Sequence, residues 1–332
     1  MKIKFVVDKR TELMEVLLKL TDYFEFYPDL KVEIETDYIK YVEKYFAPFK
    51  EHRAVNLLNE IIHNLNFCYD APISLALQLN EDFTFTELEP YPFEERCDKD
   101  PRILEFLKEM KKFALDSNFD KFYNEHKKVF AKWISATQKQ VGEQILDYMD
   151  KFYKEKLNRK YVINLMPLQT NGNYGCSVKD TSICNACIKY NDKADKNFIF
   201  MWKDDSSALV QHEFLHPLIN PLTSKYFDYS KMPKLPKKIL KQMEELTYTD
   251  GETYVDEQVI RCTTILYLTA LHGEEKQEEW IKDEEEQGFI HTRPILQALK
   301  EYEKQDLPLR KYYPKLMEEF YKPLEIKKET TL

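Results

Sequence analysis

The stretch Gln211-His212-Glu213-Phe214-Leu215-His216 decides how the rest of this 332-residue chain is interpreted. It reads H-E-x-x-H, and histidines four residues apart lie one turn apart on the same face of an α-helix, where both imidazoles can bind one ion. Glu213 directly follows the first histidine, so its carboxylate can reach a water on that ion without being a ligand. The motif therefore predicts a metal site on a helix, beside a base that can activate water.

The residues before the motif fit this interpretation. Residues 197–202 form a short apolar and aromatic run that predicts a strand, and residues 203–206 offer acidic and hydroxyl side chains that suit a helix N-cap. From Ser207 onward, apolar residues recur at helical spacing around the two histidines. We expect a strand that leads into a capped helix over residues 206–216.

Pro217 directly follows the second histidine. Proline removes a helical N–H and disfavours the helical conformation of the residue before it. We therefore expect the motif helix to end, or at least to kink, at His216.

A catalytic zinc site needs a third protein ligand, for which residues 252–261 offer two glutamates. Glu252 completes a capping box with Thr249, so a local role explains it. Glu257 opens an apolar helix and needs a partner, which is either the metal ion or Arg261 four residues on. We prefer Glu257 as the ligand over the isolated His272 and His291, with Arg261 supporting it or contacting substrate. The alternative is a plain Glu257–Arg261 pair on a solvated face.

Composition excludes several classes of partner. The net charge is −9 and no basic stripe is present, which argues against nucleic acid. No apolar run reaches the length of a membrane span, and the start of the chain becomes charged before a signal-peptide core could form. As written, the sequence predicts a soluble cytoplasmic protein, or a secreted one if a signal peptide was removed; its oligomeric state is left open.

Six cysteines are too sparse for a disulfide scaffold. Cys184 and Cys187 form a C-x-x-C with Cys176 nearby, but no second such pair or nearby histidine completes a structural zinc site. We expect free thiols here.

The pattern of apolar residues predicts an α+β, mainly helical fold. Residues 1–155 are mostly helical, with a strand at residues 2–7 and a helix capped by Thr11, and residues 156–332 form a zincin-like region, the two together making one unit. The later helices are expected over 38–46, 52–66, 71–79, 101–115, 119–133 and 137–153. A strand at 161–168 and turn residues at 169–175 point to a small mixed sheet that packs against the motif helix.

Residues 173–178 follow this turn, and two interpretations are open. Asn173, Tyr174 and Gly175 either belong to a loop or edge strand beside the site, where an extended peptide substrate adds as another strand, or to an ordinary hairpin loop.

The motif and the later glutamate together resemble the gluzincin clan of zinc metallopeptidases. More narrowly, the chain resembles a bacterial family of gluzincin-like metallopeptidases catalogued only as a domain of unknown function. The resembling segments follow nearly the whole chain in order: residues 45–50, 69–71, 171–175, 212–216 with 220–222, Glu257 with Arg261, and 288–290. The resemblance implies that His212, His216 and Glu257 bind Zn²⁺ and that Glu213 is the catalytic acid/base. Pro217 and Cys176 depart from the family pattern.

Three functions remain to be separated. The first is a zinc-dependent peptide-bond hydrolase acting on a peptide or protein, in which Tyr254, Tyr226, Arg261 or His291 donates a hydrogen bond to the oxyanion. The second is a catalytically inactive zincin-like protein that binds peptide or metal, which Pro217 would favour if it displaced His216. The third is a helical scaffold with a chance H-E-x-x-H.

Overall fold

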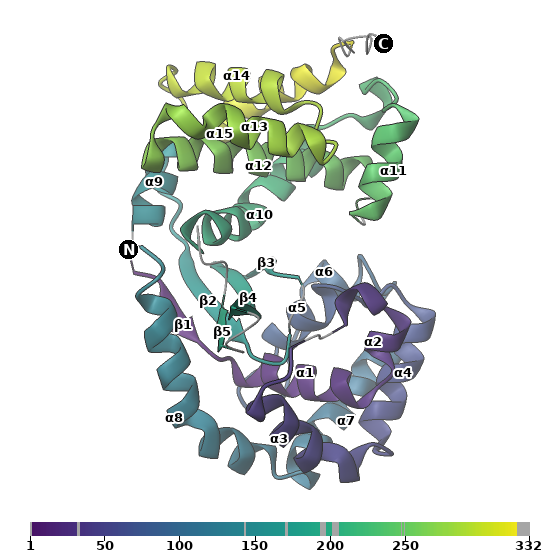
Figure 1. Ribbon diagram of the computed structural model, residues 1–332. Helices are drawn as coiled ribbons and strands as arrows, with labels where there is room; N and C mark the ends of the chain where they lie inside the picture. Colours follow the sequence, from purple (N-terminus) through teal and green to yellow (C-terminus); the bar gives the residue numbers. More distant parts are fainter. Residues whose placement is uncertain are drawn as a thin grey trace, which may run out of the picture. The chain divides into compact units, whose positions relative to one another are not determined.

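The computed structural model (Figure 1) describes residues 2–31, 34–142, 144–169, 172–192, 197–200, 206–246, 248 and 250–323. The chain divides into two units. Unit 1 comprises Met1–Glu143 and Arg159–Phe214, and unit 2 comprises Gln144–Asn158 and Leu215–Leu332. The units interleave along the chain, so the single change of pattern near residue 155 does not mark their boundary. Within the described residues, no helix is both long and apolar enough to cross a membrane.

Unit 1 holds the sheet and most of the early helices. Its elements are β1 (Lys4–Val6), α1 (Lys9–Leu20), α2 (Tyr23–Phe26), α3 (Asp37–Phe46), α4 (Arg53–Asn64), α5 (Ala71–Leu77), α6 (Pro90–Phe93), α7 (Pro101–Asp116), α8 (Phe119–Gln138), β2 (Lys160–Met166), β3 (Tyr174–Val178), β4 (Thr181–Asp192) and β5 (Asn197–Phe200). The motif helix α10 (Ser206–Tyr226) begins in unit 1 and ends in unit 2.

Unit 2 is helical in its described residues. It contains α9 (Gln144–Tyr153), α11 (Lys237–Glu245), α12 (Gly251–His272), α13 (Gln277–Glu286), α14 (Thr292–Glu303) and α15 (Leu309–Met317). Helices α12, α13, α14 and α15 lie side by side (Figure 1). The expected fold class, α+β and mainly helical with a small mixed sheet, is confirmed.

The sheet of unit 1 has the strand order β1-β2-β4-β3, and β5 also pairs with β4. β1, β2 and β4 run parallel, whereas β3 and β5 run antiparallel to β4. The sequence analysis did not predict β4, although it is the longest strand and pairs with three others. The largely apolar segment Ile183–Ile188 is typical of a strand, but the spacing of Cys184 and Cys187 was interpreted only as a possible metal motif.

Alternation along β2 gives the sheet two different faces. Tyr161 packs edge-on against Phe214 of α10 at 5.0 Å between ring centroids, so this face meets the motif helix. Asn164 lies on the opposite face, because its position differs in parity. Nδ2 of the Asn164 side chain donates to Thr11 of α1 and to Asn185 of β4, and Oδ1 of the same side chain accepts from the backbone N–H of Asp8.

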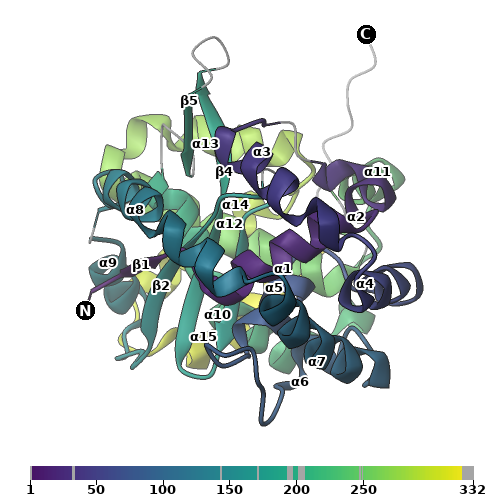
Figure 2. The ribbon, with the colours of Figure 1, turned by 90° about the horizontal axis from the view of Figure 1, so that it is seen from below.

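Helix α1 begins earlier than the sequence predicts. Asp8 is the N-cap and accepts from the backbone N–H of Arg10, whereas Thr11 lies inside the first turn and donates its hydroxyl to the Asp8 carbonyl. The prediction of Thr11 as the cap was therefore wrong. Asp8, three residues earlier, caps the helix, and the Thr11 hydroxyl accepts a hydrogen bond from Asn164 of the sheet. Figure 2 shows α1 among α3, α4 and α5, with α8 running along β1.

Three other boundaries differ from the sequence-based expectations. Residue 137 belongs to α8 and not to the following helix, and Phe24 lies in the separate short helix α2. Tyr174 and Gly175, expected in a turn, are the first residues of β3. Gly172, just before β3, has a φ of +84°, a left-handed conformation that glycine adopts without strain.

Helix α1, which Asn164 bonds through Thr11, also carries two buried carboxyl groups, Glu12 and Glu15. Glu12 accepts a hydrogen bond from the Tyr38 hydroxyl, and both Glu12 and Glu15 are almost inaccessible to solvent. Burial raises the pKa of Glu12 to about 7, even though the Tyr38 bond acts to lower it. Burial and the neighbouring Glu12 raise the pKa of Glu15 well above its usual value.

We expect Glu12→Gln to stabilise the protein at alkaline pH. The folded pKa lies above the unfolded value of about 4.3, so this carboxyl's contribution is full below that pH and is lost as the pH rises through about 7. Urea unfolding should show the variant about 1–3 kcal/mol more stable than wild type at pH 8 and little changed at pH 4. Glu87→Gln, in an exposed loop of unit 1, is the control. Equal destabilisation of the Glu12 variant at both pH values would contradict the expectation.

Candidate metal centre

Helix α10 does not end at its second histidine. It runs from Ser206 to Tyr226 with Pro217 and Pro221 inside it, so the expected boundary at His216 was wrong. An interior proline costs roughly 3 kcal/mol, and full burial of one isoleucine side chain returns about 1.5–3 kcal/mol. Ile219, between the two prolines, and Thr223, beyond both, are fully buried, and the Thr223 hydroxyl bonds that of Tyr313 at 2.7 Å. Packing in unit 2 therefore carries the helix past the prolines.

The expected strand and cap before the motif are described in part. β5 covers residues 197–200 of the predicted strand, and Ser206 is the first residue of α10. Residues 201–205, which include most of the predicted cap, lie outside the described residues.

The continuous helix brings the predicted ligands together. His212, His216 and Glu257 each offer one ligand atom, and these three atoms all lie within 4.8 Å of one another. His216 Nε2 is 3.6 Å from Glu257 Oε1. Two ligand atoms about 2.1 Å from a tetrahedral ion are about 3.4 Å apart, so this pair already has the spacing of metal ligands. A protonated His216 paired with Glu257 would give the same separation, but that pairing alone does not explain the adjacent His212.

A neighbouring amide assigns the two nitrogens of His216 to different tasks. Nδ1 lies 3.4 Å from Oδ1 of Asn220, one helical turn further along α10. The amide oxygen can accept only from a protonated Nδ1, which leaves the lone pair of a neutral ring on Nε2, the nitrogen that faces Glu257. The sequence analysis missed this role for Asn220, although its position four residues after His216 was a usable signal.

Glu257 is deeply buried and divides its two oxygens between two partners. Oε1 is the atom near His216, and Oε2 accepts a hydrogen bond from Nε of Arg261 at 3.0 Å. The side chain is on α12, inside the helix and not at its head, and the residue is only 5% exposed. A Glu257–Arg261 pair exists, but the alternative that placed it on a solvated face was wrong. Burial lowers the pKa of Arg261, while the carboxylates of Glu257 and Glu284 outweigh this effect and raise it above its usual value.

The predicted capping box pairs Glu252 with Thr249, which lies outside the described residues. Asp250 is the N-cap of α12 and accepts from the backbone N–H of Thr253 at 2.7 Å. The exposed Glu252 instead accepts a hydrogen bond from the hydroxyl of Ser224 on α10. The cap of α12 is thus Asp250, one residue after the Thr249 that the sequence predicted.

Glu213 lies on the part of α10 that belongs to unit 1. It is 5% exposed and close enough to Cys184 of β4 for its charge to matter: burial raises the pKa of that thiol well above its usual value, and Glu213 raises it further. Cys184 faces α10 because its partner in register is Ile163 of β2, which shares a face with Tyr161. The base candidate therefore lies next to His212 on α10 and is largely shielded from solvent.

The C-x-x-C cysteines lie on opposite faces of β4, because residues three apart on a strand alternate sides. Cys184 and Cys187 therefore cannot both bind one metal ion while β4 is a regular strand. Cys176, Cys184 and Cys187 are all buried free thiols.

Tyr254 and His291 bind each other in the core of unit 2. The Tyr254 hydroxyl lies 2.8 Å from Nδ1 of His291, and the ring of Tyr254 stacks on Phe289. Tyr254 is 1% exposed, and burial raises its pKa far above the usual value. Burial lowers the pKa of His291 to about 4, so this ring is neutral at physiological pH.

The predicted substrate-edge residues stand at the start of β3. Asn173 Oδ1 accepts from the backbone N–H of Cys187 at 3.0 Å and so fixes the entry to the strand. Tyr174 and Gly175 pair with Asn185 and Cys184. Because β3 ends the strand order of the sheet, an edge strand and not an ordinary hairpin loop occupies Tyr174–Val178.

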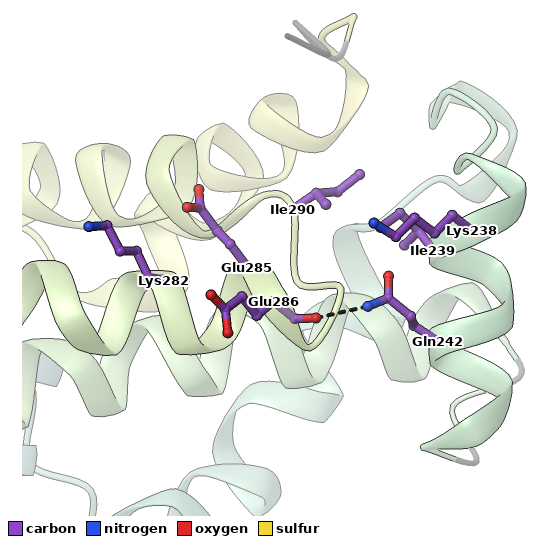
Figure 3. Close-up of a pocket in the computed structure, with 7 residues that line it drawn as sticks. All are labelled: Lys238, Ile239, Gln242, Lys282, Glu285, Glu286 and Ile290. Carbon is purple, nitrogen blue, oxygen red and sulfur yellow. Dashed lines mark hydrogen bonds between the residues drawn. The ribbon is translucent and has the colours of Figure 1, made fainter. Parts of the chain in front are cut away.

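A shallow pocket of about 440 Å³ lies elsewhere in unit 2, between α11 and α13 (Figure 3). Lys238, Lys282, Glu285 and Glu286 give it mixed charge, and Gln242 bonds the Glu286 carbonyl across it at 2.8 Å. None of the three candidate ligands lines it.

Substitution of Glu257 and of Glu252 should show which of the two glutamates is a metal ligand. Glu257→Ala removes one of three ligands and should weaken zinc binding at least tenfold, whereas Glu252→Ala removes an exposed hydrogen bond and should leave binding unchanged. Competition with a chromophoric chelator measures both affinities. Weaker zinc binding in the Glu252 variant than in the Glu257 variant would refute the ligand assignment.

Comparison with known proteins adds a family assignment. A family model described as a domain of unknown function, DUF4932, matches residues 3–325, which is nearly the whole chain. No curated protein and no solved structure matches it. The chain belongs to the DUF4932 family.

Proposed function

We propose that this protein is a zinc-dependent peptide-bond hydrolase. The observation that carries the proposal is the meeting of two imidazoles and one carboxylate within 4.8 Å, with Glu213 next to the first histidine. Three protein ligands of this kind, with a fourth position left for water, are typical of catalytic zinc sites, whereas structural sites use four protein ligands and favour cysteine.

His212, His216 and Glu257 would hold the ion. Zinc in such a site lowers the pKa of a water towards neutrality and polarises the substrate carbonyl. Nitrogen and oxygen donors also suit other transition metals, but two imidazoles with one carboxylate favour zinc over magnesium or calcium, which prefer oxygen ligands.

Glu213 would move the proton. Its carboxylate takes a proton from the attacking water and passes it to the leaving amine nitrogen, which must be protonated before the peptide bond can break. Glu213 is well suited to this task because α10 fixes it beside His212 and its side chain is only 5% exposed.

None of the four candidates for the second oxyanion donor is favoured by its position. Tyr254 and His291 are bonded to each other in the core, and Arg261 is occupied by carboxylates. Tyr226 lies ten residues beyond His216 on the same helix, which is about 15 Å along the axis.

The substrate would be an extended peptide that pairs with β3. Among the described residues β4 is the one strand paired with β3, so the outer edge of Tyr174–Val178 can offer backbone groups to a peptide. The rival proposal, an inactive binding protein, depended on Pro217 displacing His216. Continuity of α10 through Pro217 removes that support.

Glu213→Gln tests the mechanism directly. The variant should retain about one zinc per chain and lose about 10²–10⁴-fold in peptide cleavage, because the amide cannot accept the proton. Zinc content and turnover of a mixed peptide library measure the two properties. Cleavage by the variant at the wild-type rate, or a zinc-loaded wild type that cleaves no peptide, would refute the proposal.

A further inference from the structure

We propose that Glu284 on α13 is a positioning residue for the metal site, acting through Arg261 to hold Glu257 with a single oxygen directed at the ion. The inference rests on the proposed metal site and assigns a role to a residue that no sequence motif marks.

The contacts form a chain across three side chains of unit 2. Arg261 uses Nε to bond Oε2 of Glu257 at 3.0 Å and Nη1 to bond Oε2 of Glu284, also at 3.0 Å. The guanidinium also lies over the ring of Phe289, 4.3 Å from its centroid. Two carboxylates, the side-chain oxygen of Gln287 at 3.4 Å and an aromatic face thus restrain the planar group, which is only 18% exposed.

This restraint determines which oxygen of Glu257 is available. With Oε2 bound to a fixed guanidinium, Oε1 is the oxygen left near His216. Without Glu284, the guanidinium would keep its attraction to Glu257 but could rotate and bond both of its oxygens, as arginine and carboxylate commonly do. Binding of both oxygens by Arg261 would compete with the metal ion.

The net charge around Glu257 also supports a role for Glu284 at the metal site. Glu257, Arg261 and Glu284 sum to one negative charge in a largely buried cluster, which a cation stabilises. Removal of the Glu284 charge would leave this cluster neutral and weaken the attraction for an ion.

The chain offers a matched control on the same helix. Glu285, the next residue of α13, is bonded by Arg293 at 2.9 Å, and Arg293 also bonds Glu278. This second fork has the same composition, one arginine between two glutamates, but Arg293 is 48% exposed. Exposed pairs of this kind contribute little to stability.

The experiment compares Glu284→Gln with Glu285→Gln, and Arg261→Lys with Arg293→Lys, in the full-length protein. Three quantities are measured: zinc affinity by chelator competition, the visible spectrum of the Co²⁺-loaded protein, and the unfolding midpoint of the metal-free protein. Glu284→Gln and Arg261→Lys should weaken zinc binding about 10–100-fold and change the Co²⁺ spectrum, whereas the two controls stay within about twofold of wild type.

Each outcome decides the matter. Wild-type zinc affinity and an unchanged Co²⁺ spectrum in Glu284→Gln would overturn the inference, and a lowered unfolding midpoint alone would mark Glu284 as merely structural. If the zinc affinities follow the expectation while wild type cleaves no peptide, the positioning role stands and the hydrolase fails. A wild type that binds neither zinc nor cobalt would overturn both.

Discussion

A carboxylate with almost no access to water needs partners for its charge, and Arg261 bonds one oxygen of Glu257 while the other lies 3.6 Å from Nε2 of His216. The candidate metal centre depends on this division. Arg261 alone would neutralise Glu257 as a simple ion pair, and the imidazole alone would require a protonated ring. Together they leave one carboxylate oxygen turned towards two histidines, an arrangement that a divalent cation would complete.

Helix α10 is the element that makes the arrangement possible, and it depends on packing more than on local preference. Two prolines lie in its second half, where isolated sequence would break a helix. Buried side chains on either side of the prolines keep it continuous, so His212 and His216 stay one turn apart and Asn220 follows one turn later. The same continuity places Glu213 against the sheet and the histidines on the neighbouring positions of the helix.

Polar groups in the interior of unit 1 are arranged in two separate layers. On one face of the sheet, the charge of Glu213 raises the pKa of the Cys184 thiol, and on the other, Asn164 links α1 to β4. Glu12 and Glu15 extend the second layer into a region where burial favours their protonated forms. The first layer includes the proposed base, Glu213. The second layer, with Glu12 and Glu15, makes the stability of the protein depend on pH.

The sequence by itself determined the parts of the site whose geometry is local. Spacing of four along a helix set the two histidines on one face, and an acid expected at the start of an apolar helix required a partner, which pointed to Glu257 and Arg261. The fold class and the strand at β2 followed from the same periodicity.

Only the tertiary structure decided the rest, because it depends on contacts between distant segments. Packing carried α10 past Pro217, and the meeting of α10 with α12 gave Glu252 its bond to Ser224. Pairing with three other strands made a strand of the C-x-x-C segment, and the fold of unit 2 brought Glu284 to Arg261 across 23 residues. A one-dimensional pattern records what a residue prefers, whereas its partner is fixed only when the chain has folded.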